Sequence, residues 1–153
     1  MTKPAEPVAD IESEIEIHAP ILVVWETMTS TETVPEWLGC LEYAGRVGSR
    51  FYMQPDEASR RAGNIDGATC CEIETMNAPE TFVFSWFFPD TPKTYVRFDL
   101  VSVSDTLTRV RLKHFGWDQF PAEIIRHVRD SLAGGWQSAV LPQLKAVSEM
   151  RVT

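Results

Sequence analysis

The sequence predicts an α+β fold in which an antiparallel sheet is followed by one long C-terminal helix. Residues 94–103 and 107–115 alternate apolar with polar side chains, the pattern of strands with one face on a core and the other in water. Residues 122–150 instead repeat apolar side chains at steps of three and four, as an amphipathic helix does. Because the strands come as a run before this helix, we expect the helix to cover one face of the sheet.

The N-terminal part adds one strand and two short helices. Residues 11–18 alternate isoleucine or serine with mainly acidic side chains, which indicates a half-buried strand. A short helix is expected over residues 20–28, where a proline opens an apolar segment. A second short helix is expected within residues 30–39, ending at Gly39.

Further strands are expected in the middle of the chain. Residues 42–47 and 50–54 are predicted to form one bent strand or two, and residues 68–76 another. The polar residues 54–67 are predicted to form a loop. Residues 81–88 would form a strand that is apolar on both faces, so alternation alone leaves its inward face open. The face taken as inward carries Phe82, Phe84, Trp86 and Phe88.

The predicted C-terminal helix contains three poor helix formers, Gly134, Gly135 and Pro142. A glycine costs roughly 1 kcal/mol and a proline roughly 3 kcal/mol in a helix interior. We expect the helix to continue through the glycines and to bend around residues 138–142. A glycine suits a place where a backbone or a ligand approaches the helix closely, which requires that the glycines do not face bulk solvent.

The length and composition indicate a globular protein with one domain. The chain has 153 residues, of which 44% are hydrophobic and 24% charged. Residues 1–10 contain two prolines and no periodicity, so they are predicted to form a flexible tail before a single domain at 11–153. The net charge of −8 and the absence of a basic patch argue against binding to nucleic acid or an anionic membrane surface.

Cysteine content and the N-terminus predict a cytoplasmic protein. The three cysteines, Cys40, Cys70 and Cys71, have no metal-ligand spacing and form no disulfide framework. The N-terminus has no apolar signal-peptide segment, and no apolar run is long enough to insert into a membrane. We expect no metal ion and no other cofactor.

Five segments occur along the chain in a recognisable order. They are IEIHAPILVVWETMT, VGSRFYM, APETFVFSW, TRVRLKHFGW and GGWQSAVLPQL. Together they resemble the activator-of-Hsp90-ATPase-like branch of the START-like, or SRPBCC, superfamily, over about residues 11–150. The resemblance implies a helix-grip fold, in which a bent antiparallel sheet wraps around the C-terminal helix and leaves a cavity. It also implies a hydrophobic ligand in that cavity, and homodimers are common in the family.

The resemblance and the strand alternation together predict the residues that line this cavity. The candidate ligand-binding residues are Phe51, Met53, Phe84, Trp86, Phe98, His114, Trp117, Leu132 and Trp136. We expect a small hydrophobic or aromatic molecule as the partner, because a ligand pocket is mainly apolar with a few placed polar groups. The alternative for each aromatic residue is a place in the filled core.

Two other functions remain open from the sequence. An enzyme of the cyclase or hydrolase type could use His114 as an acid–base group, together with Glu72 or Asp118. That function needs His114 in the cavity beside a carboxyl group or a tyrosine, with a displaced pKa. A protein-interaction module, such as a chaperone partner, would instead show an exposed apolar patch and a filled interior.

Overall fold

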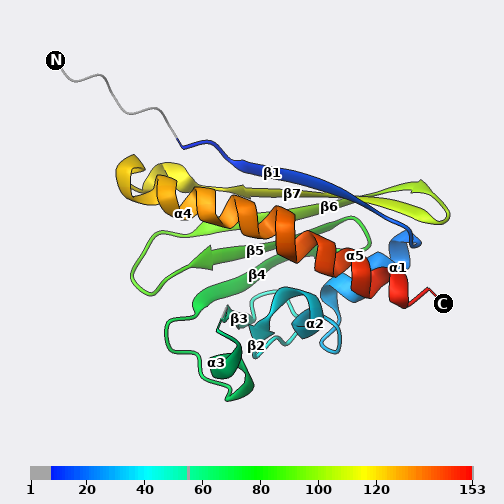
Figure 1. Cartoon of the computed structure of the whole chain (residues 1–153), viewed down its shortest axis with the longest axis horizontal. Helices are drawn as coiled ribbons and strands as arrows, with labels where there is room; N and C mark the ends of the chain where they lie inside the picture. The colour runs from blue at the N-terminus through cyan, green and yellow to red at the C-terminus, as the bar shows by residue number, and fades with distance from the viewer. Residues whose placement is uncertain (1–7, 55, 153) are drawn as a thin grey trace.

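Seven antiparallel strands form one sheet in the order β1-β7-β6-β5-β4-β3-β2 (Figure 1). The computed structural model describes residues 8–54 and 56–152, the side chains of residues 122–124 excepted. The strands are β1 (Ile11–Ile17), β2 (Cys40–Leu41), β3 (Arg50–Met53), β4 (Thr69–Asn77), β5 (Thr81–Phe87), β6 (Thr94–Ser104) and β7 (Leu107–Phe115).

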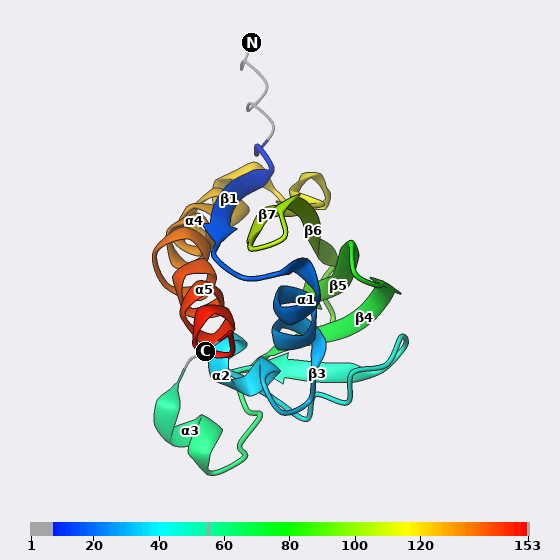
Figure 2. The ribbon, with the colours of Figure 1, turned by 90° about the vertical axis from the view of Figure 1, so that its right-hand side faces the viewer.

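Helices and helical turns make up the rest of the regular structure. They are α1 (Ile21–Thr29), α2 (Val34–Leu38), α3 (Glu57–Arg61), a 3-10 turn (Trp117–Gln119), α4 (Ala122–Gly135), a π turn (Trp136–Val140) and α5 (Leu141–Met150). Helix α4, the π turn and α5 follow one another as one long helix. Seen end-on, the sheet curls around α1, and the long helix runs along the open side of the curve (Figure 2). This confirms the predicted α+β fold, with a bent antiparallel sheet, a long C-terminal helix and two short helices after the first strand.

Aromatic side chains fill the space between the sheet and the helices. Phe84 of β5 and Phe98 of β6 lie side by side on the inner face, with ring centroids 6.1 Å apart. Trp37 of α2 meets Phe98 edge-on at 5.8 Å, and Trp136 of the long helix meets it edge-on at 6.2 Å. All four side chains are buried. Such edge-to-face contacts add to the free energy of burial and hold the helices against the sheet.

The long helix continues through Gly134 and Gly135, as the sequence predicts. Gly135 has helical dihedral angles, φ −64° and ψ −43°. The irregularity follows as the π turn, in which the amide of Leu141 donates to the carbonyl five residues earlier. Pro142 comes directly after this turn, and it has no N–H to donate to the preceding helical turn. A single wide turn next to this proline is a common way to keep such a helix continuous.

The close approach of protein backbone that we expected at the two glycines is absent. A Cβ atom built on Gly134 or Gly135 would meet nothing within 4 Å, and Gly134 is exposed. The packing role predicted for these glycines is therefore wrong. The physical reason is that the neighbouring Trp136, which is buried and contacts Phe98, fills the space between the helix and the sheet.

Replacing Gly134 by alanine is expected to raise the free energy of unfolding by about 1 kcal/mol. Alanine restricts the unfolded chain more than glycine does, and its methyl group meets no atom here. Gly116→Ala is the contrasting variant, because Gly116 has φ +97° and its Cβ would lie 3.3 Å from the Cα of Thr94. Urea unfolding followed by circular dichroism should rank the proteins G134A, wild type, G116A; any other order contradicts this account.

The predicted strand over residues 42–47 is wrong. Glu42 and Gly45 have φ values of 63° and 71°, which break an extended chain. The hydroxyl of Tyr43 donates to the carbonyl of Thr29 at 2.7 Å and ties this loop to the end of α1. Only the second of the two predicted pieces, residues 50–54, forms a strand, as β3.

Two further local predictions differ from the structure. The predicted loop over residues 54–67 contains helix α3, whose N-cap Asp56 accepts a hydrogen bond from the amide of Ser59 at 2.9 Å. The strand predicted to end at Phe88 ends one residue earlier, and Phe88 is exposed. The inward aromatic face of β5 therefore ends at Trp86.

Part of the predicted N-terminal tail is packed on the domain. Residues 1–7 lie outside the described part of the chain. Over residues 8–10, the guanidinium of Arg129 on α4 donates to the carbonyls of Ala9 and Asp10 at 2.9 and 3.0 Å. These bonds attach the chain to the long helix immediately before β1 begins.

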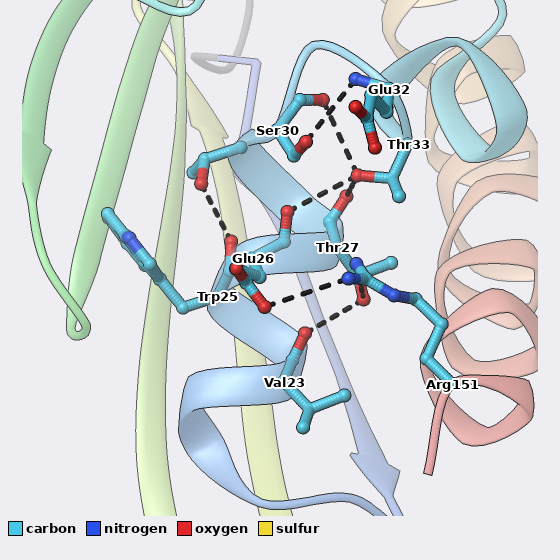
Figure 3. A network of polar contacts seen from close by, with 9 residues as sticks. Val23, Trp25, Glu26, Thr27, Ser30, Glu32, Thr33 and Arg151 are labelled. Carbon is cyan, nitrogen blue, oxygen red and sulfur yellow. Dashed lines mark hydrogen bonds and ion pairs between the residues drawn. The ribbon is translucent and has the colours of Figure 1, made fainter. Parts of the chain in front are cut away.

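Polar contacts also fix the far end of the long helix to α1 and α2 (Figure 3). Arg151 donates to the hydroxyl of Thr27 at 3.2 Å and lies 3.6 Å from the carboxylate of Glu26. The carbonyl of Thr27 accepts from the hydroxyl of Thr33 at 2.7 Å and from the indole of Trp37 at 3.0 Å. Buried hydrogen bonds thus attach α2 to α1, and Arg151 attaches the end of the long helix to the same helix α1.

Candidate functional site

His114 of β7 lies on the inner face of the sheet with both ring nitrogens engaged. Its Nε2 lies 2.8 Å from the hydroxyl oxygen of Thr94, whose own proton is donated to the carbonyl of Trp86 at 2.7 Å. The hydroxyl oxygen is therefore the acceptor, and Nε2 carries the proton of the imidazole. The indole N–H of Trp136 points to Nδ1 at 3.3 Å, which gives Nδ1 a donor.

The surroundings of His114 disfavour its charged form. The ring packs against Trp86, Trp117 and Trp136, at centroid distances of 5.4, 4.4 and 6.2 Å. Burial lowers the pKa of His114 to about 3, so the ring is neutral near pH 7. A general acid or base must exchange its proton with a substrate, and this ring has no nitrogen left to do so.

The carboxylates considered as partners of His114 lie elsewhere. Glu72 of β4 is on the outer face, where it forms ion pairs with Arg50 at 2.7 Å and Lys93 at 3.4 Å. Asp118 is exposed. The geometry therefore does not support the predicted acid–base role of His114.

Two of the buried cysteines, Cys40 and Cys71, offer no reactive thiolate either. All three cysteines are free and buried. Burial raises the pKa of the Cys40 thiol to about 12, and it raises that of Cys71 well above the usual value. Since the thiolate is the nucleophilic form, a thiol held protonated in this way suits packing and not catalysis.

Three of the predicted ligand-binding residues meet around an apolar pocket of about 260 Å³. Met53 comes from β3, Trp86 from β5 and Leu132 from the long helix. Leu38 of α2 and Val140 of the π turn complete the apolar lining. The pocket thus lies between the sheet and the long helix, where the resemblance places a ligand.

The rest of the pocket wall comes from the end of α2, the segment after β3 and the start of β4. Gly39, Gln54, Arg60 and Thr69 line it. The buried side-chain amide of Gln54 donates to the carbonyls of Asn64 and Asp66 at 3.1 and 3.2 Å, and so holds this loop in place. The sequence did not predict these residues as part of the site. Asp56, a residue type that often caps a helix, could have indicated a helix in this segment that contains Arg60.

The other predicted ligand-binding residues are placed in the filled interior. Each of them is at most 1% exposed, and none lines the pocket: Phe51, Phe84, Phe98, His114, Trp117 and Trp136. They contact one another and the helices, so they shape the wall behind the pocket. A ligand in the pocket would touch Trp86 directly and these residues only through it or through Leu132.

A larger hollow of about 590 Å³ lies at the β1 edge of the sheet and reaches Gln137 of the long helix. Its lining includes Glu12, Glu14, Arg111 and Lys113. Arg111 already pairs with Glu14 at 3.1 Å. Because charged, water-exposed side chains surround it, this hollow is not suited to an apolar ligand.

The fold agrees with the outcome of a comparison against protein families. The family model described as activator of Hsp90 ATPase homolog 1-like protein matches residues 18–149. The chain belongs to this family. A search of curated protein sequences finds no match. Within the described part of this family member, no helix is long and apolar enough to span a membrane.

Solved structures of similar proteins share the fold of this Hsp90-activator-like chain. A protein from Mesorhizobium loti is 22% identical, with 94% of this chain and 96% of that chain covered and a TM-score of 0.67. An HSP90 activator from Plasmodium falciparum is 19% identical, with 90% and 94% covered and a TM-score of 0.69. The Aha1 dimer from Colwellia psychrerythraea is 20% identical, with 92% and 96% covered and a TM-score of 0.67. At these identities the likeness shows the fold alone.

Proposed function

We propose that this protein binds a small hydrophobic or aromatic molecule in the pocket between β3, β5 and the long helix, without chemistry. The observation that carries the proposal is the apolar lining by Leu38, Met53, Trp86, Leu132 and Val140. A volume of about 260 Å³ is just below the usual range for drug-sized ligands. It therefore suits a molecule on the order of a dozen non-hydrogen atoms. The engaged nitrogens of His114 support binding over catalysis.

Replacing Leu132 by tryptophan is expected to abolish this binding. The larger ring would project into the pocket from the long helix and fill it, with a modest cost in stability. Calorimetric titration with 1-octanol should show one molecule bound per wild-type chain, and a loss of affinity of about tenfold or more in L132W. Native mass spectrometry of the freshly purified protein would then identify the ligand that it carries.

The matched control is Ala146→Trp on helix α5. Ala146 is exposed, so the same ring stands in solvent and leaves the pocket unchanged. Binding of 1-octanol to A146W should equal binding to the wild type. If L132W binds 1-octanol as tightly as A146W does, the pocket is not the binding site.

A second candidate is a chaperone-related protein contact. It is favoured by the apolar side chains that are exposed at one end of the molecule, Leu22 of α1 at 67% and Val152 after α5 at 48%. The relative from Plasmodium falciparum is described as an HSP90 activator. The test is the rate of ATP hydrolysis by an Hsp90-type chaperone, with and without this protein and its Leu22→Glu variant. A rate that the wild type does not change would exclude this candidate.

A homodimer and a cytoplasmic location belong to the same proposal. The dimeric relative from Colwellia psychrerythraea supports the former. The three free cysteines support a reducing compartment, and thus the latter. Light scattering during size-exclusion chromatography would establish the number of chains in solution.

A further inference from the structure

We propose that Arg60 makes the apolar pocket selective for a small carboxylic acid, whose chain enters the pocket and whose carboxylate pairs with the guanidinium. The inference rests on the proposed function and names the chemical class of its ligand. Five features of the structure carry it: the place of Arg60, its fixation, its unpaired charge, the lack of other charges in the pocket, and the cost of covering it.

Arg60 stands where the apolar pocket meets a second, more polar hollow. The second hollow has a volume of about 340 Å³ and lies between α2, α3 and the long helix. The two hollows share Leu38, Gly39, Arg60 and Val140 in their linings. The guanidinium lies close to Gly39, since a Cβ built on that glycine would be 3.5 Å from Nη1. The charge is therefore at the boundary between the apolar interior and the water-facing hollow.

The position of this guanidinium is fixed by its own loop. Nη1 donates to the carbonyl of Gln54 at 2.8 Å, and the backbone amide of Arg60 donates to the carbonyl of Asp56 at 2.9 Å. Gln54 is itself buried and bonded to the carbonyls that follow α3. A fixed guanidinium loses less conformational entropy when an anion binds than a free surface arginine does.

Among the described residues, Arg60 forms no direct ion pair: the carboxylate of Asp56 attracts it from a distance but is exposed and accepts hydrogen bonds from Ser59. The neighbouring Arg61 pairs with Glu57 at 2.5 Å, and Arg50 pairs with Glu72 at 2.7 Å. Within the described residues, the guanidinium of Arg60 donates one hydrogen bond, to the neutral carbonyl of Gln54. A guanidinium has five N–H donors in a planar fork, which matches the two oxygens of a carboxylate.

No other residue of the pocket lining carries a charge. Besides Arg60, the lining consists of apolar side chains, one glycine, Gln54 and Thr69. Glu36 lines only the outer hollow and is exposed, so its charge is screened by water. The net charge of −8 repels anions in general, and a local cation at the pocket is what would make an anionic ligand acceptable.

A neutral ligand of the same shape would bind less well, because it would cover the guanidinium of Arg60 without pairing with it. Its chain would fill the pocket and exclude water from one side of the guanidinium without giving that charge a partner. A charge that is desolvated and left unpaired costs free energy, whereas a carboxylate restores the lost interactions. Selectivity for the acid over its neutral analogue follows.

The test compares octanoate with 1-octanol by calorimetric titration near neutral pH. We expect the wild type to prefer octanoate by roughly ten- to a hundredfold, the range for hydrogen bonds to a charged group. Arg60→Met should remove this preference, because octanoate loses its partner, while 1-octanol binds at least as tightly as before, since it no longer covers an unpaired charge. Retained 1-octanol binding also shows that R60M keeps its pocket. Arg61→Met, next to it but paired with Glu57, should leave both affinities unchanged.

Each contrary result has its own meaning. If the wild type binds octanoate and 1-octanol equally, or if R60M weakens both alike, the selectivity by Arg60 is overturned while the proposed pocket stands. If neither molecule binds to the wild type, the proposed function fails, and the role of Arg60 fails with it. If R61M loses octanoate as R60M does, a general surface potential accounts for the preference, and the inference is overturned.

Discussion

The stability of this protein is expected to fall by about 4 to 5 kcal/mol between pH 6.5 and pH 3 because of His114 alone. Burial holds the pKa of His114 at about 3 in the folded state, against its ordinary value of 6.5. Between these two values the unfolded chain binds a proton at this residue and the folded chain does not. Each fall in pH through this window therefore stabilises the unfolded state relative to the folded state. Below about pH 3 both states bind the proton, so this group adds nothing further.

Replacing His114 by glutamine should remove this part of the pH dependence. The amide has one acceptor and donors of its own, so it can take the places of Nδ1 and Nε2 between Trp136 and Thr94. We expect H114Q to be less stable than the wild type near pH 7, because its shape fits the indoles less well. The two stabilities should converge as the pH falls toward 3, since only the wild type loses stability at this residue.

The measurement is the free energy of unfolding in urea, followed by far-ultraviolet circular dichroism at several pH values. The acidic residues of the chain contribute to acid unfolding in both proteins, so the difference between the two curves is the relevant quantity. His127→Gln on α4 is the control for the loss of a histidine at an exposed position. Parallel curves for H114Q and the wild type would show that His114 takes up its proton without unfolding.

The sequence predicts most of the sheet and both ends of the long helix, because the patterns there have a clear period. The strand around Val110 alternates along its whole length and the strand around Val96 does so as far as Leu100, and each is buried there on the expected face. Prediction fails where a single backbone angle sets the direction of the chain. Glu42 has a positive φ of 63°, which its residue type does not indicate. Prediction also fails at Phe88, where a turn ends the strand before its last aromatic residue.

The candidate site is predictable only in part, because periodicity gives the face of a residue and not its distance from a void. Phe98 and Met53 both belong to inward faces, yet Phe98 is surrounded by rings and Met53 borders the pocket. Arg60 lies in the short helix α3, which has no buried face that a periodic pattern could reveal, and its place depends on how Gln54 holds the loop. Nor can the spacing of residues show that Trp136 fills the gap beside two glycines.

Replacing Phe98 by alanine is expected to lower the free energy of unfolding by about 3 to 5 kcal/mol. Phe98 is fully buried, and its ring contacts those of Phe82, Phe84, Trp37 and Trp136. Removing the ring leaves a void that these neighbours, fixed by α2 and the long helix, cannot close. Phe98→Leu keeps most of the volume and should cost about 1 kcal/mol. Urea unfolding of the three proteins gives these differences directly.

Variants at Phe98 and Met53 distinguish a core residue from a pocket residue. Phe98 does not line the pocket, so F98L should bind 1-octanol within about twofold of the wild type. Met53 lines it and is only partly buried, so Met53→Ala should cost less stability than F98A and yet weaken 1-octanol several-fold. The opposite outcome, with F98L losing the ligand and M53A retaining it, would move the binding site into the aromatic interior that the sequence first suggested. That result would require the rings around Phe98 to part when a ligand enters, because the packed side chains leave it no space.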